Sequence, residues 1–429
     1  MPAPLVRRIV LCLALASPAV VFRLTGFAPN PIVDLFVFGG AVVAASFLLA
    51  WAAEAAQKDI SGALAIAILA LIAVLPEYAV DLYYAFRSGS DASYEQFAAA
   101  NMTGSNRLLL GFGWPLVVFV ALFVARRAAA RKAAGGTGDA RASRGSRTLD
   151  LPGSSRLDIG VLAIVAVLAF LVPLTGQIAL WFGIVLILIF AAYLWKAGRA
   201  ADDGHEEEFV GTAAHIANMP ERARKATFVG MFVVAAAVIL SSAEPFADAL
   251  VQSGSRLGVD SYFLVQWLAP LASEAPEFIV AVLFALRGQG AAAIATLIAS
   301  KINQWTLLVG SLPIAHLLGG GGGALPLDGR QVEEFVLTAS QTVMGVAIIL
   351  ALRFHRWAAV VLVALFAVQF VVTDETGRYV LSGLHIVVAA VAVWINRHDV
   401  GATLSAPFRR SEDLAAGPAE RELSEAAAR

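Results

Sequence analysis

The chain has 429 residues, of which 59% are hydrophobic and only 15% are charged, and its mean hydropathy is +0.76. Soluble globular proteins carry about 25% charged residues, so this composition excludes an ordinary soluble domain and indicates a polytopic membrane protein. A net charge of −1 provides no basic surface for nucleic-acid binding. The single cysteine, Cys12, cannot form an internal disulfide and gives no metal-site pattern.

Apolar runs of about 20 residues, long enough to cross a bilayer, occur throughout the chain. We therefore expect an all-α membrane protein with about twelve transmembrane helices. The expected spans are residues 5–24, 32–55, 61–87, 92–125, 157–174, 177–196, 226–250, 259–287, 289–317, 332–352, 355–373 and 379–396. The fourth and ninth spans are long, and we expect breaks near Gly111–Pro115 and near Pro313.

Three segments are too polar to form a core of their own. Residues 128–156 are rich in Arg, Gly and Ser, residues 197–225 carry mixed charge, and residues 397–429 form a charged, Ala-rich tail. We expect each segment to be disordered or loosely helical.

The distribution of Lys and Arg predicts how the chain is oriented. If the N-terminus is cytoplasmic, the same side receives the basic clusters at 126–156 and 199–225, whereas the loops 25–31 and 174–177 on the other side carry no Lys or Arg. We therefore expect both termini in the cytoplasm. The Ala- and Arg-rich composition with short loops favours a prokaryotic inner (plasma) membrane.

The first and last spans stand apart from a core of two equal halves. The arginine pair followed by an apolar run near the N-terminus also resembles a signal peptide, but no strong Ala-x-Ala site follows, so we expect an uncleaved anchor. Five spans remain on each side of the central polar segment, and an odd number gives the halves opposite orientations. This is the inverted-repeat plan of many transporters. The expected division is 1–31 (anchor helix), 32–196 (first half), 197–225 (cytoplasmic linker), 226–373 (second half), 374–396 (extra helix) and 397–429 (tail).

Two short segments in the two halves are nearly the same. One is Pro76-Glu77-Tyr78-Ala79-Val80, and the other is Pro276-Glu277-Phe278-Ile279-Val280. Each places an acid directly after a proline inside an apolar run, where an ionisable residue is costly and indicates a functional site. Because proline also frees a backbone carbonyl, each segment offers carboxylate and carbonyl oxygens, the ligands that hard cations prefer.

The helices that follow these acids add polar atoms at helical spacing. Asn101 and Ser105 are four residues apart and share one helix face, and Thr296 and Ser300 have the same spacing. These side chains can serve as cation ligands, or they can form hydrogen bonds that only hold helices together.

Three further ionisable residues lie close to the paired acids in the sequence. Asp81 is one turn beyond the first acid, and Glu274 is one turn before the second. Lys301 could neutralise one of the acids while no cation is bound. Cation binding would then displace the ammonium, and release of its proton would couple transport to protons. In the alternative interpretation, Lys301 only locks an acid in an ion pair.

At these residues the chain resembles the membrane region of sodium/calcium exchangers, in the cation/calcium antiporter superfamily. That family carries two inverted alpha-repeats, each with Gly-Thr-Ser-x-Pro-Glu on one helix and Gly-Asn/Asp-x-x-Gly-Ser-Asn on the next. Both Pro-Glu pairs match the end of the first motif, and the second motif is matched by Asn101, Gly104, Ser105 and Asn106. The motifs lie within residues 61–111 and 259–310.

The resemblance implies that Glu77 and Glu277 are the central metal ligands, assisted by Asn101 and Ser105. The candidate cation-binding residues are Glu77, Glu277, Asn101, Ser105, Glu274, Ser273, Thr296 and Ser300, with Lys301 and Asp81 as candidates for coupling.

Departures from the family pattern concern the ligands more than the fold. The first repeat reads Ala73-Val74-Leu75 where the family has hydroxyl side chains, and the second reads Ser273-Glu274-Ala275, which keeps one hydroxyl and adds an acid. Thr296 and Lys301 stand where the family has Asn or Asp. The transported ion and its stoichiometry therefore stay open.

We expect a secondary active antiporter that moves Ca²⁺ or a related cation in exchange for Na⁺ or H⁺ by alternating access. The alternatives are a sodium/proton exchanger on the same fold, which Lys301 and the lost hydroxyls favour, and a non-transporting scaffold or sensor. No His-Glu zinc pattern or nucleophile–base pair accompanies the acids, so we do not expect an enzyme. The expected partners are inorganic cations and the lipid bilayer, without cofactor or nucleic acid, and the sequence indicates no oligomeric state.

Overall fold

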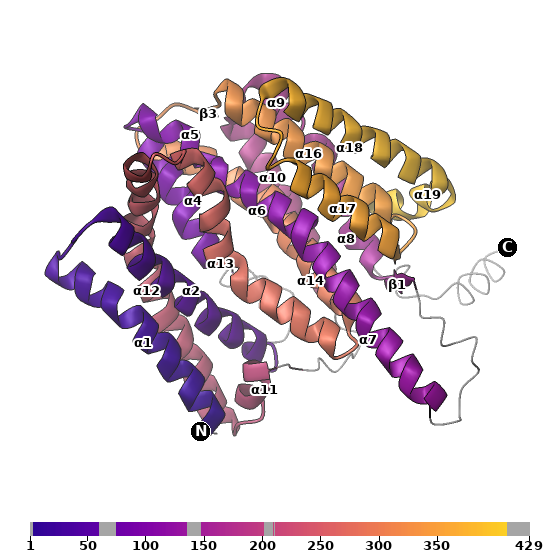
Figure 1. Ribbon diagram of the computed structural model, residues 1–429, viewed down its shortest axis with the longest axis horizontal. Coiled ribbons are helices and arrows are strands. Elements are labelled where there is room, and N and C mark those ends of the chain that lie inside the picture. Colours follow the sequence, from indigo (N-terminus) through magenta and orange to yellow (C-terminus); the bar gives the residue numbers. More distant parts are fainter. Residues whose placement is uncertain (1–2, 60–73, 135–146, 201–208, 210, 410–429) are drawn as a thin grey trace.

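The computed structural model describes residues 3–59, 74–134, 147–200, 209 and 211–409 (Figure 1). The α-helices are α1 (Ala3–Thr25), α2 (Pro31–Ala56), α4 (Leu75–Ser88), α5 (Glu95–Ala98), α6 (Ala100–Leu108), α7 (Trp114–Ala134), α8 (Ser155–Leu168), α9 (Leu171–Thr175), α10 (Leu180–Ala200), α11 (Gly211–Ala217), α12 (Glu221–Leu257), α13 (Ser261–Leu286), α14 (Gly290–Asn303), α15 (Val309–Leu318), α16 (Gly329–Ile349), α17 (Arg356–Val368), α18 (Glu375–Ile395) and α19 (Arg397–Ser405). Short 3₁₀ turns span Ala92–Tyr94 and Ala406–Phe408.

In the described part of the chain, four three-residue strands connect loops at the helix ends. Strand β1 (Thr148–Asp150) pairs with β4 (Arg353–His355), and β2 (Gln177–Ala179) pairs with β3 (Ala324–Pro326), both antiparallel. Each pair joins the first half of the chain to the second.

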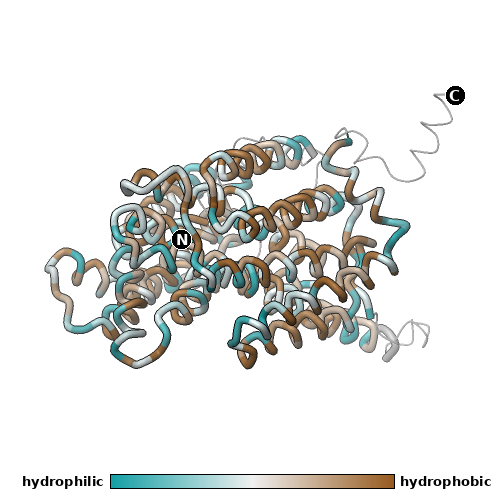
Figure 2. Tube along the Cα trace, turned by 90° about the horizontal axis from the view of Figure 1, so that it is seen from above, coloured by the Kyte–Doolittle hydropathy of each residue, from teal (hydrophilic) through white to brown (hydrophobic). Residues whose placement is uncertain are grey.

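The expected all-α, polytopic membrane fold is confirmed. Within the described residues, ten helical segments are long and apolar enough to cross a membrane, and α17 is a shorter apolar helix. Hydrophobic residues dominate these helices in Figure 2. The expected span 61–87 lies partly outside the described residues, which contain only its C-terminal part, α4.

No break occurs near Pro313, because α15 continues through it; near Gly111–Pro115 the α-helix gives way to a π turn, but the helical segment does not end there. Residues 92–131 and 290–318 each form one continuous helical segment. Each contains a π-helical turn, η2 (Leu109–Gly113) in the first and η3 (Gln304–Leu308) in the second. A π turn loosens the hydrogen-bond ladder, so Pro115 can follow η2 without ending the helix.

The two π turns belong to a repeat that the helices share. They begin 195 residues apart, at positions 109 and 304, and the same offset relates Ser105 to Ser300 and Asn106 to Lys301. Helix α4 with α6, and α13 with α14, are thus corresponding pairs. In Figure 1, α1, α2 and α12 lie on one side of these central helices and α16 to α18 lie on the other.

The described parts of two of the polar segments include helices that pack on the rest of the fold. The C-terminal tail begins with α19, which packs on α8, and Arg156 donates hydrogen bonds to Asp399 (3.0 Å) and Thr403 (2.8 Å). The central linker contains the short helix α11, which packs against α2. Each segment thus packs against a long apolar helix of the core, α8 or α2, which compensates for its own low apolar content.

A buried ion pair joins the end of α2 to the start of α12, and these helices pack along each other. Arg224 donates to both carboxylate oxygens of Asp59, at 2.6 and 2.5 Å, and these bonds hold the pKa of Asp59 below its usual range. The resulting stabilisation is present above the unfolded-state pKa of about 3.9 and is lost as the pH falls through the lower folded-state pKa.

We expect Asp59→Asn to lower the free energy of unfolding by about 1 kcal/mol at neutral pH. The melting temperatures of wild type and variant should converge in acid, where the carboxylate of the wild type is protonated. Thermal unfolding of the detergent-solubilised protein over a pH series measures both effects. Glu221→Gln is the control, because the Glu221–Lys225 pair is exposed and should contribute little. A difference that does not shrink as the pH falls below about 3.9 would contradict the ion-pair explanation.

Candidate functional site

Glu77 and Glu277 lie on corresponding helices but in different local settings. Helix α4 begins at Leu75, so Pro76 and Glu77 occupy its first turn, where proline needs no donor. Helix α13 continues through Pro276, which leaves the carbonyl of Ala272 without its helical donor. Glu77 is buried, with 5% of its surface exposed, whereas Glu277 is partly accessible.

In the first repeat, buried carboxylates and polar side chains face one another across α4 and α6. Asp81 and Asn101 are adjacent and fully buried, and Ser105 lies beside both Glu77 and Glu274 without meeting hydrogen-bond geometry to either. Within the described part of the chain, Oε1 of Glu77, Oγ of Ser105 and both carboxylate oxygens of Asp81 have no hydrogen-bond partner. Groups of this kind are expensive to bury unless something satisfies them.

In the second repeat, the acids have direct partners on the following helix. Ser300 donates to Oε2 of Glu277 at 2.8 Å, and Gln304 donates through Nε2 to Oε1 of Glu274 at 2.7 Å. The other oxygen of Glu274 has no partner among the described residues. Ser105 and Ser300 thus accompany the acids of the two repeats at equivalent positions.

Lys301 lies at the contact between the two repeats. It is fully buried, and its Nζ donates to the carbonyl oxygen of Asn106 (2.8 Å) and to Oδ1 of the same residue (3.1 Å). Among the described residues it forms no ion pair with a carboxylate, although the charge of Glu274 acts on it. Lys301 therefore contacts its own counterpart in the first repeat, and neither of the two expected contacts with an acid is formed.

The sequence model of a family described as sodium/calcium exchanger protein matches residues 31–197 and 227–373, most of the chain. The chain belongs to this family. It is a secondary active cation antiporter with the two-repeat helical core of its relatives. Comparison with curated protein sequences finds no significant match.

Solved structures of exchangers share the fold. The crystal structure of the H⁺/Ca²⁺ exchanger CAX superposes with a TM-score of 0.85 and 34% sequence identity, covering 95% of this chain and 98% of that one. The structure of YfkE gives a TM-score of 0.59 at 14% identity, covering 89% of this chain and 99% of that one. The sodium-calcium exchanger NCX_Mj gives a TM-score of 0.51 at 15% identity, covering 80% and 98%.

Two residues that the sequence predicted as cation ligands, Thr296 and Ser273, use their hydroxyls to bond carbonyl oxygens of their own helices. Thr296 lies one turn before Ser300, toward the N-terminal end of α14; it is exposed, and its hydroxyl donates to the carbonyl oxygen of Ala292 at 3.1 Å. Ser273 is buried, but its hydroxyl donates to the carbonyl oxygen of Ala269 at 3.2 Å.

Gln304 is a site residue that the sequence interpretation missed. It follows Thr296 and Ser300 at the same four-residue spacing, so the helical pattern contained the signal. Tyr78 and Asn303 form a further link between the repeats that was not foreseen, with a hydrogen bond of 2.9 Å.

The described residues contain no group of three His, Cys, Asp or Glu side chains arranged to hold a metal ion. A cation carried between these helices would therefore need hydroxyl and amide oxygens in addition to the carboxylates. Ser105, Asn101 and Gln304 are buried groups that offer such oxygens beside the acids.

Proposed function

We propose that this protein exchanges Ca²⁺ for protons across a prokaryotic inner (plasma) membrane by alternating access. In this proposal Glu77 and Glu277 are the principal cation ligands, and Asn101, Ser105 and Glu274 assist them. The halves 32–196 and 226–373 act as the two repeats, with both termini and the 197–225 linker in the cytoplasm.

The observation that supports the proposal is the set of unpaired carboxylate oxygens beside Asn101 and Ser105. An ionised carboxylate away from water costs much free energy unless a counter-charge or a proton neutralises it. Glu77, Asp81 and Glu274 are buried with at least one oxygen unpaired in the described structure. If either a cation or protons must neutralise the same oxygens, binding of one ion displaces the other, and that competition is the basis of exchange.

The comparison with CAX favours protons as the counter-ion. That protein is an H⁺/Ca²⁺ exchanger, and its 34% identity extends over nearly the whole chain.

Exchange of Na⁺ for protons is the second candidate, and Lys301 favours it. A protonated Lys301 near Glu274 would lower the net negative charge that the site presents. A smaller negative charge suits a monovalent ion better than a divalent one.

The test is uptake of radiolabelled Ca²⁺ into proteoliposomes under an imposed pH gradient and, separately, under a sodium gradient. We expect uptake with the pH gradient and none in Glu277→Gln. Uptake with the sodium gradient alone would show that Na⁺, and not H⁺, is the counter-ion. No Ca²⁺ uptake under either gradient would refute calcium exchange and leave Na⁺/H⁺ exchange, which a pH-sensitive dye inside the same vesicles would detect.

Lys301→Ala should alter the pH dependence of transport more than its maximal rate. Removing the ammonium leaves the acids without their nearby positive charge, so more of their neutralisation must come from protons or the cation. Because loss of a nearby positive charge raises the pKa of an acid, we expect the pH of half-maximal exchange to rise by about one unit. Lys301→Arg keeps the charge and is the matched control. An unchanged pH profile in Lys301→Ala would show that the lysine only joins the repeats through Asn106.

A further inference from the structure

A second group of buried charges lies on the opposite face of α6 from Ser105. Arg107 follows Ser105 by two residues, which is a rotation of about 200° around the helix. Its side chain is almost completely buried and forms an ion pair of 2.5 Å with Glu334 of α16. Arg107 also donates to Oε1 of Gln369 at 3.0 Å and lies 5.0 Å from the ring centre of Trp267 on α13.

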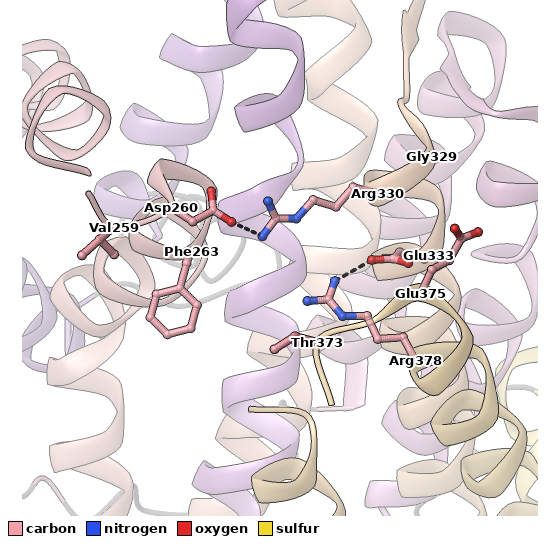
Figure 3. A pocket seen from close by; sticks show the side chains of 9 residues that line it. All are labelled: Val259, Asp260, Phe263, Gly329, Arg330, Glu333, Thr373, Glu375 and Arg378. Carbon is pink, nitrogen blue, oxygen red and sulfur yellow. Dashed lines mark hydrogen bonds and ion pairs between the residues drawn. The ribbon is translucent and has the colours of Figure 1, made fainter. Parts of the chain in front are cut away.

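The ion pairs continue from α16 to the surface. Glu334 also pairs with Arg378 of α18, and Arg378 bonds Glu333 at 2.7 Å. Arg378 and Glu333 line a pocket of about 690 Å³, which Figure 3 shows together with a separate pair between Arg330 and Asp260. A chain of charges thus runs from this pocket to the helix that carries Asn101 and Ser105.

The fold itself does not need a charge at this position. The counterpart of Arg107 in the second repeat, by the 195-residue offset, is Ile302, which is fully buried in an equally helical segment. A buried ion pair is weak support for stability but can fix the register of one element against another. Arg107 contacts three helices or their ends, so it restricts both the rotation and the position of α6.

Helix α6 is short and lies between irregular elements. It has nine residues, follows the single-turn helix α5 and continues into the π turn η2. The regular α-helical pattern therefore changes on both sides of the segment that presents Asn101 and Ser105, although the helical segment continues. Side-chain contacts with α13 and α16 must then define the orientation of these side chains.

We propose that Arg107 and Glu334 are positioning residues of the cation site, which hold α6 in the register that directs Asn101 and Ser105 toward the acids. The assignment of those two side chains as ligands rests on the proposed function. The anchoring of α6 does not depend on which ion is carried, and the experiment measures it separately.

The experiment uses the full-length protein and three altered forms of the pair. Arg107→Met removes one charge and leaves Glu334 with Arg378. Arg107→Met/Glu334→Leu replaces the pair by apolar side chains, which buried sites generally tolerate, so a folding failure of the single variant does not end the test. Arg107→Lys keeps the positive charge but lacks the planar guanidinium group and its several hydrogen-bond donors. Arg330→Met is the control, because Arg330 lines the same pocket but pairs with Asp260.

Hydrogen–deuterium exchange of residues 100–108 and Ca²⁺ uptake kinetics are the two measurements. In the double variant we expect amide exchange in α6 to rise about tenfold, with α14 unchanged. We also expect the KM for Ca²⁺ to rise about tenfold with little change in the maximal rate per folded protein, because the ligands are present but misdirected. Arg107→Lys should recover part of the KM, and Arg330→Met should behave as wild type.

A purely structural role would reduce the amount of folded transporter and hence the maximal rate, without moving the KM. A folded double variant with wild-type exchange in α6 and a wild-type KM would overturn the proposal. If the wild type carries no Ca²⁺, the proposed function fails, and amide exchange in α6 still decides whether the pair anchors the helix.

Discussion

Glu77→Gln and Glu277→Gln should each abolish cation exchange while the protein stays folded. Glutamine keeps the size and one hydrogen-bonding oxygen of glutamate but can neither carry the negative charge nor take up a proton. Because each acid lies on its own repeat, neither can replace the other. We expect the initial rate of Ca²⁺ uptake in proteoliposomes to fall about 100-fold or more in either variant, the equivalent of removing one charged ligand.

Two matched variants separate loss of the site from general damage. Ser300→Ala removes the hydroxyl that donates to Glu277 at 2.8 Å but leaves the carboxylate, so we expect a loss of about tenfold in cation affinity. Glu244→Gln removes an acid whose pair with Arg23 is about half exposed, so the rate should be unchanged. Wild-type transport by Glu77→Gln would exclude that acid from the site.

The two acids could be predicted as site residues because few ionisable residues are tolerated inside a membrane span. An ionisable residue after a proline in an apolar run is rarely accidental, and the repetition of Pro-Glu at 76–77 and 276–277 identified the corresponding helices. The membrane spans were predictable for the same reason, since each must bury about 20 apolar residues.

Contacts between helices were much less predictable. The four-residue spacing places Ser300 and Thr296 on one face of α14, but it does not tell how far along the helix that face stays buried. Only the packed structure shows that Thr296 is exposed and that Ser300 reaches Glu277. The meeting of Lys301 with Asn106 likewise depends on how the repeats pack, which no local pattern encodes.

The continuity of the long spans was also beyond a local rule. Proline inside a helix usually breaks or kinks it, and that rule predicted a break near Pro115. The structure instead has a π turn at Leu109–Gly113, which redistributes the hydrogen bonds before the proline. Sequence alone does not distinguish these two responses, because the proline removes the same backbone donor in either case.

Gly104 should be as sensitive to substitution as the acids, for a steric reason. It lies on α6 where that helix meets α13, and a Cβ atom added there would lie 1.7 Å from the carbonyl oxygen of Gln266 and 2.7 Å from its carbonyl carbon. Backbone atoms cannot rotate away as a side chain can, so Gly104→Ala must push the two helices apart. The corresponding residue of the second repeat is Ala299, so this close approach is a property of the first repeat.

We expect Gly104→Ala to lower the free energy of unfolding by about 3 kcal/mol, the upper range for overpacking, and to raise the KM for Ca²⁺ because Ser105 moves with the helix. Thermal unfolding in detergent and uptake kinetics measure the two effects. Gly230→Ala is the control, since a Cβ at this helical position in α12 meets no atom within 4 Å and alanine favours helix by up to about 1 kcal/mol. If Gly104→Ala had the melting temperature and the transport kinetics of wild type, close packing of α6 against α13 at Gly104 would not be needed for stability or for cation binding.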